Sequence, residues 1–252
     1  MLRTRVIPTL LLKNGGLVKT RRFQNPVYIG DPINAVRVFN EKEVDELVCI
    51  DITATAESRA PDYDLIAAIA GEAFMPIAYG GGICNKEDAK RIFGLGIEKV
   101  IVNHLLQSDP RAVEQIAINA GSSSLIASID VRQTMFGRYQ AVGDRGNRPW
   151  KESPIEVAQF AVSLGAGEVL LGAIDRDGMM SGYDLELIAG VSNAVSVPII
   201  ALGGARNIQD LRKAADQGAA GVAAGSMFVF HGKHRAVLLN YPSQDELDMA
   251  LI

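Results

Sequence analysis

Cysteine and histidine are scarce in this chain of 252 residues, which contains two cysteines and three histidines. Cys49 and Cys84 form no CxxC pair, so the sequence predicts neither a disulfide framework nor a cysteine metal site. His231 and His234 lie near the C-terminus without metal-ligand spacing, and His104 stands alone. We therefore expect no metal and no cofactor, and a reducing cytoplasm as the setting.

Long apolar runs and a strong net charge are also missing. The apolar run near the N-terminus is too short for a signal peptide or a membrane span, so no membrane contact is expected. The formal charge of −4 argues against a general nucleic-acid binder. No low-complexity linker divides the chain, and we interpret residues 1–252 as one domain.

What the sequence does have is a glycine-rich motif that occurs twice. Residues 75–83 read MPIAYGGGI, and residues 197–205 read VPIIALGGA. Gly82 and Gly204 are 122 residues apart, which is close to half of the chain. In each copy a proline opens a short apolar run, and glycines end it before a helix-like segment. Such a turn presents backbone N–H groups to an anion with no side chain in the way.

Apolar, β-rich runs alternate with amphipathic segments along the chain. Because the runs are apolar throughout, they are typical of parallel strands buried on both faces. Eight strand–helix units predict a closed (β/α)8 TIM barrel made of two half-barrels, about 1–120 and 121–240. A doubly wound open sheet is the alternative, but it explains the half-length repeat less well. The predicted strands are Arg5–Leu12, Leu47–Ile52, Met75–Ile83, Lys99–Val102, Leu125–Val131, Val169–Ile174, Ile199–Leu202 and Gly221–Ala224. The polar segment 13–30 is predicted to be a loop.

In a barrel of this kind, functional residues lie at the carboxyl ends of the strands. The repeat predicts two phosphate sites there, so a ligand with a phosphate at each end would fit. The first site would use Gly81, Gly82 and Asn103, and the second would use Gly203, Gly204, Gly225 and Ser226, with Gly178 nearby. The alternative is that these glycines only make tight strand-to-helix turns.

Carboxylates at the same strand ends are candidates for proton transfer. They are Asp51, Asp130, Asp175 and Asp177. Asp130 ends the apolar run Leu125–Ile129, where burying an idle carboxylate would be unfavourable. The end of the first strand, Leu10–Leu12, offers no carboxylate. Asp51 and Asp175 also have a structural alternative, which is hydrogen bonding to loop backbone.

Several motifs together point to a known family. They include Arg5–Pro8 (RVIP), Gly30–Pro32 (GDP), Asp51–Ala54 (DITA), Gly80–Ile83 (GGGI), Ser128–Asp130 (SID) and Ile174–Gly178 (IDRDG). From residue 1 to about 230 the chain resembles the cyclase subunit of imidazole glycerol phosphate synthase, the HisF family. The resemblance implies a (β/α)8 barrel that forms a heterodimer with a HisH-like glutaminase subunit. In that family, ammonia from the glutaminase passes through the barrel to a doubly phosphorylated substrate.

The resemblance also implies catalytic residues. Cyclisation in the family relies on two aspartates at the barrel mouth. One corresponds to Asp130, and the other falls at Leu11, which cannot transfer a proton. We therefore expect cyclisation to be weak or lost. Hydroxyl residues that the family has nearby are replaced by His104, Gly172 and Leu202.

At the opposite end of the barrel the resemblance is complete. The family closes its ammonia entrance with a ring of four charges, which are matched by Arg5, Glu46, Lys99 and Glu168. Asp45 and Glu98 lie on the same rim and are expected at the interface with the partner. A complete ring beside an incomplete catalytic pair favours a conduit for ammonia over a cyclase.

Further stretches, among them Leu10–Thr20 and Asn34–Leu47, resemble one branch of the family. This is the WbuZ branch of surface-polysaccharide loci, which accompanies a glutaminase-like protein and an N-acetyl sugar amidotransferase. It implies ammonia supply for converting an acetamido sugar to an acetamidino sugar. Two other interpretations stay open: a histidine-biosynthesis cyclase whose missing aspartate is compensated, and a phosphate-binding isomerase without ammonia traffic. Such an isomerase would also need two aspartates at the mouth.

Overall fold

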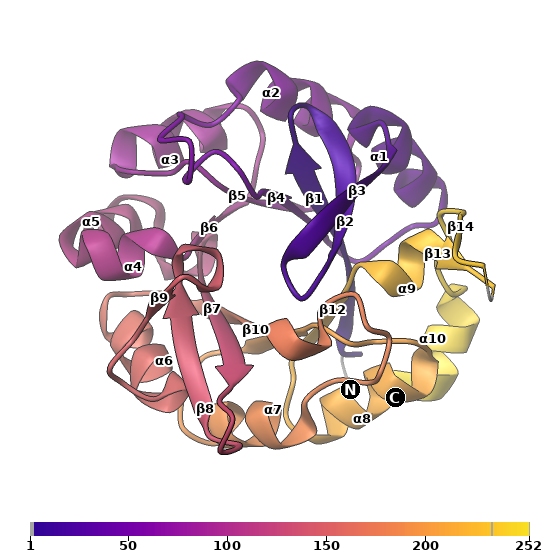
Figure 1. Ribbon diagram of the computed structural model, residues 1–252. Helices are drawn as coiled ribbons and strands as arrows, with labels where there is room; N and C mark the ends of the chain where they lie inside the picture. The colour runs from indigo at the N-terminus through magenta and orange to yellow at the C-terminus, as the bar shows by residue number, and fades with distance from the viewer. Residues whose placement is uncertain (1–2, 233, 252) are drawn as a thin grey trace.

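The computed structural model describes residues 3–232 and 234–251, and eight parallel strands in this part of the chain close into a barrel (Figure 1). The last pairing, between β10 and β7, closes the ring. In chain order the strands are β1 (Arg5–Lys13), β4 (Leu47–Asp51), β5 (Ile77–Gly80), β6 (Lys99–Val102), β7 (Leu125–Gln133), β10 (Glu168–Ala173), β11 (Ile199–Leu202) and β12 (Gly221–Ala224). The predicted (β/α)8 barrel is confirmed, and the open sheet is excluded.

Helices surround this ring of strands on its outside (Figure 1). They are α1 (Pro32–Glu41), α2 (Tyr63–Glu72), α3 (Lys86–Gly94), α5 (Pro110–Ala120), α6 (Pro154–Ser163), α7 (Leu185–Ser192), α8 (Ile208–Asp216) and α10 (Gln244–Leu251). Most begin at a side-chain cap; Ser153 and Glu156, for example, form a reciprocal capping box at α6. No helix in the described part of the chain is long and apolar enough to cross a membrane.

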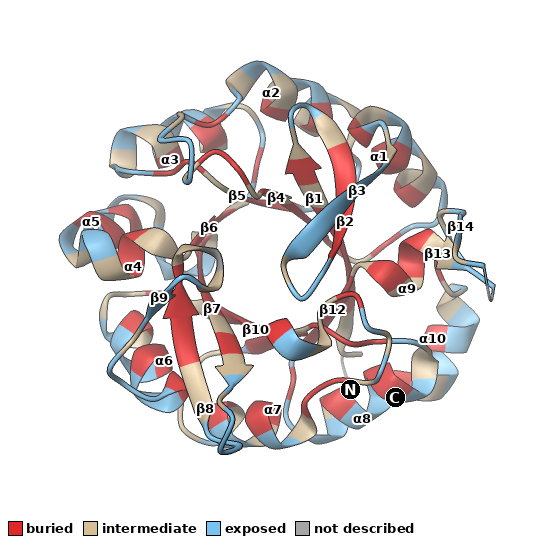
Figure 2. Cartoon of the chain, viewed as in Figure 1, coloured by how far each residue is buried: buried red, intermediate tan, exposed pale blue. Residues whose placement is uncertain are grey.

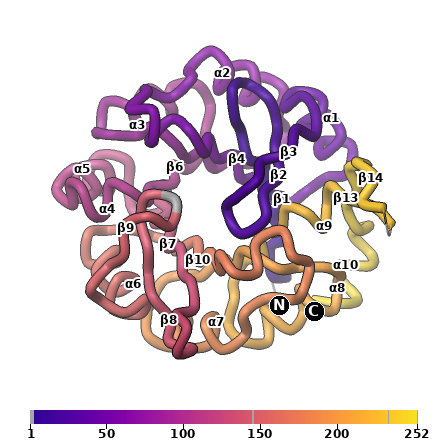
Figure 3. The backbone as a smooth tube through the Cα atoms, in the orientation of Figure 1, coloured from indigo at the N-terminus to yellow at the C-terminus, as the bar shows by residue number. Residues whose placement is uncertain are grey.

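The segment 13–30 was predicted to be a loop, and this prediction is wrong. It forms an antiparallel hairpin, β2 (Gly16–Arg21) and β3 (Gln24–Gly30), which extends across the open centre of the ring (Figures 1 and 3). Burial is one-sided: β2 is buried and β3 is largely exposed (Figure 2). A second antiparallel extension, β8 (Tyr139–Gly143) with β9 (Arg148–Pro149), continues from β7.

The half-length repeat is visible in hydrogen bonds as well as in sequence. The caps Asn85 and Asn207 are 122 residues apart, and each accepts from the backbone N–H of the residue three positions on. Those residues, Asp88 and Asp210, each accept in turn from the backbone N–H four positions back. Short helices, α4 (His104–Ser108) and α9 (Ser226–Val229), follow the fourth and eighth barrel strands. The two halves therefore share the same capping hydrogen bonds at equivalent positions.

The barrel interior consists of layers, because alternate residues of a strand point to the same side. Arg5, Glu46, Lys99 and Glu168 form the layer at the amino-terminal end. The next layer is apolar and almost completely buried, and comprises Ile7, Val48, Ala78, Ile101, Ile126, Leu170, Ile200 and Ala223. Beyond this apolar layer the strands open into a cavity. One buried apolar layer thus lies between the charged layer at the amino-terminal end of the barrel and the cavity at the carboxyl-terminal end.

Candidate functional site

The cavity at the carboxyl ends of the strands, here called the mouth cavity, has a volume of about 170 Å³. Its wall includes Thr9, Leu11, Lys19, Thr20, Asp51, Gly81, Gly82, Asn103, His104, Ser128, Asp130, Asp177, Leu202, Gly225 and Ser226. Most of the strand-end residues that were predicted from the sequence therefore gather around this cavity, whereas Gly178, Gly203 and Gly204 line a smaller one beside it and Asp175 lines neither. Lys19 and Thr20 reach it from the hairpin that was predicted to be a loop.

Asp130 projects from β7 into the mouth cavity. Burial raises the pKa of its carboxyl group to about 7, and the charge of Asp177 contributes to the increase. Asn103 opposes the shift, since its Nδ2 donates to Asp130 Oδ2 at 3.1 Å and to the Ser128 carbonyl at 3.0 Å. A Cβ atom on Gly172 would lie 2.8 Å from Asp130 Oδ1, so the missing side chain makes room for the carboxylate. A carboxyl group that titrates near neutrality can both donate and accept a proton.

Leu11 lies on the wall of the same cavity. It pairs with Ile50 of β4 on one side and with Val18 of the hairpin on the other, and its side chain is half-buried. No proton-transfer group is therefore contributed by the end of β1. Leu202 also lines the cavity and adds to the apolar part of the wall.

Asp177, one of the four carboxylates predicted as candidates for proton transfer, is a second carboxylate at the mouth. Its Oδ2 accepts from Thr20 Oγ1 at 2.7 Å and from the Phe23 N–H at 3.3 Å, both in the hairpin. Burial raises its pKa, although these hydrogen bonds and the charge of Lys19 act in the opposite direction. Asp177 therefore holds the hairpin over the cavity and places a carboxylate within electrostatic reach of Asp130.

Lys19 is the buried cation of the mouth, and the sequence analysis missed it. Its Nζ donates to the Thr9 carbonyl, and burial lowers its pKa to about 8. A Cβ atom on Gly225 would lie 2.4 Å from this nitrogen, so the glycine leaves room for the ammonium group in its present position. Lys19 follows the apolar pair Leu17 and Val18, but this position alone does not indicate burial, which depends on the contact with Thr9.

The first glycine cradle consists of Gly81, Gly82, Asn103 and His104. A Cβ on Gly81 would lie 2.4 Å from the Asp51 carbonyl, so only glycine fits this turn. The Gly82 N–H donates to Thr55 Oγ1 at 3.2 Å, and the Asn103 side chain turns toward β7. His104 is the first residue of α4, and its buried Nδ1 has no partner among the described residues.

The second glycine cradle consists of Gly178, Gly203, Gly204, Gly225 and Ser226. These residues line a small cavity of about 20 Å³ beside the mouth cavity. Gly204 has a φ of +103°, and a Cβ on it would lie 2.2 Å from the Gly182 carbonyl. Within the described residues, the N–H groups of Gly178 and Gly204 have no hydrogen-bond acceptor. The second cradle thus presents free backbone donors, as the repeat predicts for an anion site.

Asp51 and Asp175 have the structural role that the sequence analysis offered as an alternative. Asp51 Oδ1 accepts from the N–H groups of Thr53 and Ala54, at 2.9 and 3.0 Å, and its Oδ2 pairs with Arg59 at 3.1 Å. Asp175 Oδ2 accepts from the Gln133 N–H at 2.7 Å. Both carboxylates therefore fix loops around the cavity.

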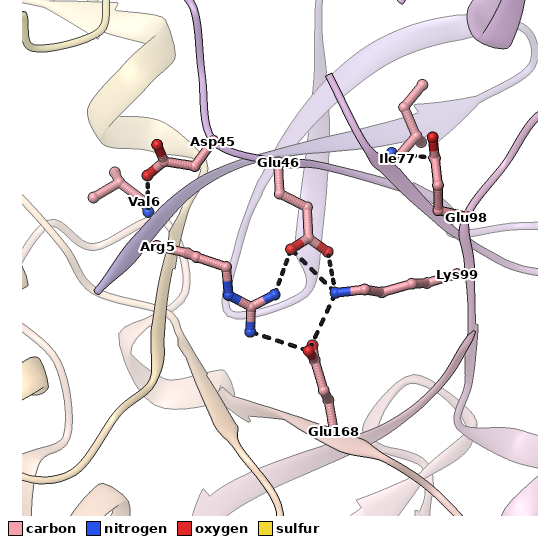
Figure 4. A network of polar contacts seen from close by, with 8 residues as sticks. All are labelled: Arg5, Val6, Asp45, Glu46, Ile77, Glu98, Lys99 and Glu168. Atoms are coloured by element: carbon pink, nitrogen blue, oxygen red, sulfur yellow. Dashed lines mark hydrogen bonds and ion pairs between the residues drawn. The ribbon is translucent and has the colours of Figure 1, made fainter. Parts of the chain in front are cut away.

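At the amino-terminal end of the barrel, Arg5, Glu46, Lys99 and Glu168 form a closed ring of ion pairs, called the charge ring below (Figure 4). Each cation contacts both carboxylates, at distances of 2.5 to 3.1 Å. These carboxylates raise the pKa of Arg5 above its ordinary value, although burial alone would lower it. The ring is electrically neutral and lies across the barrel axis.

Asp45 and Glu98, which were predicted at a partner interface, hold the starts of two barrel strands. Asp45 Oδ2 accepts from the Val6 N–H at 2.8 Å, and Glu98 Oε2 accepts from the Ile77 N–H at 2.7 Å (Figure 4). Both carboxylates lie on the same rim as the charge ring. Their interface role stays a prediction.

Comparison with known proteins gives the family. The model for "Histidine biosynthesis protein" matches residues 5–235. The chain is 50% identical to the "Putative imidazole glycerol phosphate synthase subunit hisF2" of Pseudomonas aeruginosa, over 99% of this chain and all of the relative. It is 44% identical to "hisF3" of Vibrio vulnificus, over 100% of this chain and 97% of the relative. It is 39% identical to the "Imidazole glycerol phosphate synthase subunit HisF" of Streptomyces coelicolor, over 91% of each chain. This chain therefore belongs to the histidine biosynthesis protein family, as a HisF-like subunit of the imidazole glycerol phosphate synthase type.

Proposed function

We propose that this barrel is an ammonia-conducting subunit that docks to a HisH-like glutaminase and supplies ammonia for amidation of an N-acetyl sugar in surface-polysaccharide biosynthesis. The observation that carries the proposal is that Leu11 lies on the cavity wall, at the position where the resemblance to the family implies a catalytic aspartate. A leucine can neither accept nor donate a proton, so the ring-closing chemistry lacks one of its two groups. The amidation itself belongs to a separate amidotransferase.

The entrance and the interior suit a small neutral molecule. The charge ring would act as the ammonia gate, because it lies directly below the apolar layer. Ammonia can cross a dry apolar layer, whereas ammonium would lose its hydration there. Asp45 and Glu98 on the same rim would contact the glutaminase. This arrangement supports a conduit whether or not chemistry occurs at the mouth.

The mouth would hold a phosphorylated small molecule. Gly81, Gly82 and Asn103 would bind one phosphate, and the second glycine cradle would bind the other. The N–H groups of Gly178 and Gly204, which have no acceptor among the described residues, support the second cradle as an anion site.

The names of the relatives support a separate branch. Relatives whose names carry "putative", with or without a numeral 2 or 3, are 44–50% identical to this chain. Relatives named simply as HisF are 38–39% identical. The chain thus resembles the first group more than the second.

A second candidate function is cyclisation with Asp177 in place of the missing aspartate. Asp177 lines the same cavity as Asp130, and the two carboxyl groups interact electrostatically. Against this role, both hydrogen bonds to Asp177 Oδ2 hold the hairpin, which leaves the carboxylate committed to positioning.

One assay separates the two candidates. We expect the purified chain, given ammonium and the ribonucleotide substrate of the histidine pathway, to show negligible cyclisation. Leu11→Asp restores a carboxyl group at the vacant position, and Leu11→Asn is its matched control without a proton to transfer. Turnover at the family's level by the unaltered chain, lost in Asp177→Asn, would reject the conduit and establish the cyclase. A stable complex with a co-encoded glutaminase is the second expected result.

A further inference from the structure

Three large aliphatic side chains at the carboxyl ends of the barrel strands are not completely buried. On β11, β1 and β4, the side chains of the apolar layer have no exposed surface; these are Ile200, Ile7 and Val48. Further along the same strands, Leu202, Leu11 and Ile50 are only half-buried, and all three line the mouth cavity. Their remaining apolar surface therefore faces the space in which a ligand would lie.

These three side chains form one side of the cavity wall, called the apolar arc below. The strands β11, β12, β1 and β4 are consecutive in the ring, so Leu202, Leu11 and Ile50 follow one another around it. Between Leu202 and Leu11, β12 contributes Gly225, which leaves room for the Lys19 ammonium group. Asp130 is on β7, which is four strands from β1 in either direction around the ring. The cavity therefore has an apolar side, and Asp130 lines the side opposite to it.

Packing of the barrel core does not account for the apolar arc. The apolar layer below it is already closed, and each of its side chains is at most 4% exposed. An aliphatic side chain that stays in contact with water in a cavity contributes less to stability than a buried one. Ligand pockets, in contrast, are typically lined by apolar side chains together with a few polar groups that fix the orientation of the ligand. The mouth cavity has this composition, with Asn103 and Asp130 among its polar groups.

The apolar arc begins at the second glycine cradle. Leu202, Gly225 and Ser226 line both the mouth cavity and the small cavity of that cradle. A phosphate held by the cradle would therefore direct the organic part of its ester into the mouth cavity, with Leu202 as the first side chain beside it. The mouth cavity, at about 170 Å³, has room for a six-membered ring, since a cavity of about 150 Å³ lined by similar side chains binds benzene in another protein.

We propose that the mouth binds a phosphate ester whose organic part carries few or no hydroxyl groups and packs on the apolar arc. Hydroxyl groups placed against Leu202, Leu11 and Ile50 would lose hydrogen bonds to water without gaining any from the protein. An ester of a polyol is by the same reasoning a poor ligand. The proposal rests on the phosphate-binding role that the proposed function gives to the mouth, and it does not depend on ammonia delivery.

The test compares two achiral phosphate esters that share a six-carbon ring. Cyclohexyl phosphate has a bare ring, whereas myo-inositol 2-phosphate carries a hydroxyl group on each remaining ring carbon. Because both carry one phosphate group, calorimetry at constant ionic strength isolates the contribution of the ring. We expect the unaltered chain to bind cyclohexyl phosphate roughly tenfold more tightly, which corresponds to burial of about 55 Å² of apolar surface.

Variants of the apolar arc should remove this preference. Leu11→Asn and Leu202→Asn keep the branched shape of leucine but replace its methyl groups with an amide. Each should reduce the preference to roughly threefold, and the double variant should abolish it while still binding inorganic phosphate. Leu11→Met, which stays apolar, should keep the preference. Leu238→Asn is the matched control, because Leu238 is an exposed leucine that does not line the mouth cavity.

Three results would overturn the proposal: equal affinities for the two esters in the unaltered chain, a preference that survives the double variant, and failure to bind either ester. The first would reject the apolar arc and leave the phosphate role of the mouth standing, whereas the last would reject both. The comparison on the unaltered chain decides the proposal even where a variant fails to fold, which circular dichroism reveals. Glutaminase binding by the double variant should be unchanged, because Leu11 and Leu202 are at the opposite end of the barrel from the charge ring.

Discussion

The charge ring and the mouth cavity both contain ionisable side chains. In the ring these side chains form ion pairs, whereas in the mouth burial shifts their pKa values toward the neutral form. In the ring, two cations and two carboxylates pair so that each contacts both opposite charges. In the mouth, burial raises the pKa values of Asp130 and Asp177 and lowers that of Lys19. All three shifts disfavour the charged form, so the groups at the mouth are only partly compensated.

This difference indicates that the charge ring closes one end of the barrel, whereas the mouth cavity is suited to bind a ligand. The ring is neutral, and each of its charges already contacts two opposite charges, so it needs no bound ion to close the end of the barrel. Groups with shifted pKa values in a cavity are typical of functional sites, because a ligand or a proton completes their interactions. Variants in the charge ring and at Asp130 test the two regions separately, and a variant in the hairpin tests how the mouth is covered.

The largest effect is expected in the charge ring. Glu46 is buried and accepts from both Arg5 and Lys99, so Glu46→Gln leaves two cations with one carboxylate. We expect it to lower the free energy of unfolding by about 2–3 kcal/mol, below the usual value for a buried pair because both cations are partly exposed. Urea unfolding measures the change.

The control for the ring is Glu72→Gln. Glu72 pairs with Arg37 on the surface of the barrel, where solvent screens the interaction. We expect its urea midpoint to match that of the unaltered chain. If the two variants behaved alike, the ring would contribute no more than a surface ion pair.

A smaller effect is expected for Asp130→Asn, and it depends on pH. The pKa of Asp130 is about 7 in the folded protein and about 3.9 in an unfolded chain, so between these values the folded state binds more protons. The contribution of Asp130 to stability therefore decreases as pH rises from about 4 to 7. Asp130→Asn removes this decrease and should stabilise the protein by about 1–2 kcal/mol at pH 8, less than the full pKa difference implies because the residue as a whole is partly exposed.

The measurement is the difference in unfolding free energy between the unaltered chain and Asp130→Asn from pH 4 to 8. Asn103→Leu sharpens it, since the hydrogen bond from Asn103 lowers the pKa of Asp130 and its loss should raise that pKa further. A difference that does not change with pH would show that Asp130 is charged throughout this range.

The sequence predicted the barrel because apolar strand-like runs are local patterns and because the glycine-rich motif recurs 122 residues later, and both are visible without a structure. It also predicted Asp130, since a carboxylate at the end of an apolar run stands out without any structure. It could not predict the hairpin: Lys19 and Thr20 are polar, and their burial depends on Thr9 and Asp177, the latter 157 residues away from Thr20. For the same reason the hydrogen bonds from Arg235 to the Gly178 carbonyl had no sequence signal. Contacts between distant loops decide these positions.

The smallest effect concerns the hairpin that covers the mouth, and two buried threonines of the cavity wall give a matched comparison. Thr20 Oγ1 donates to Asp177, whereas Thr9 Oγ1 is buried without a partner among the described residues. Valine has the same shape as threonine but no hydroxyl, so Thr20→Val should lose about 1 kcal/mol, while Thr9→Val should be neutral or slightly stabilising. Hydrogen exchange of residues 16–30 measures opening of the hairpin directly. Faster exchange in Thr20→Val alone would show that the hydrogen bond from Thr20 to Asp177 holds the hairpin closed. Equal exchange in both variants would mean that the apolar face of the hairpin holds it instead.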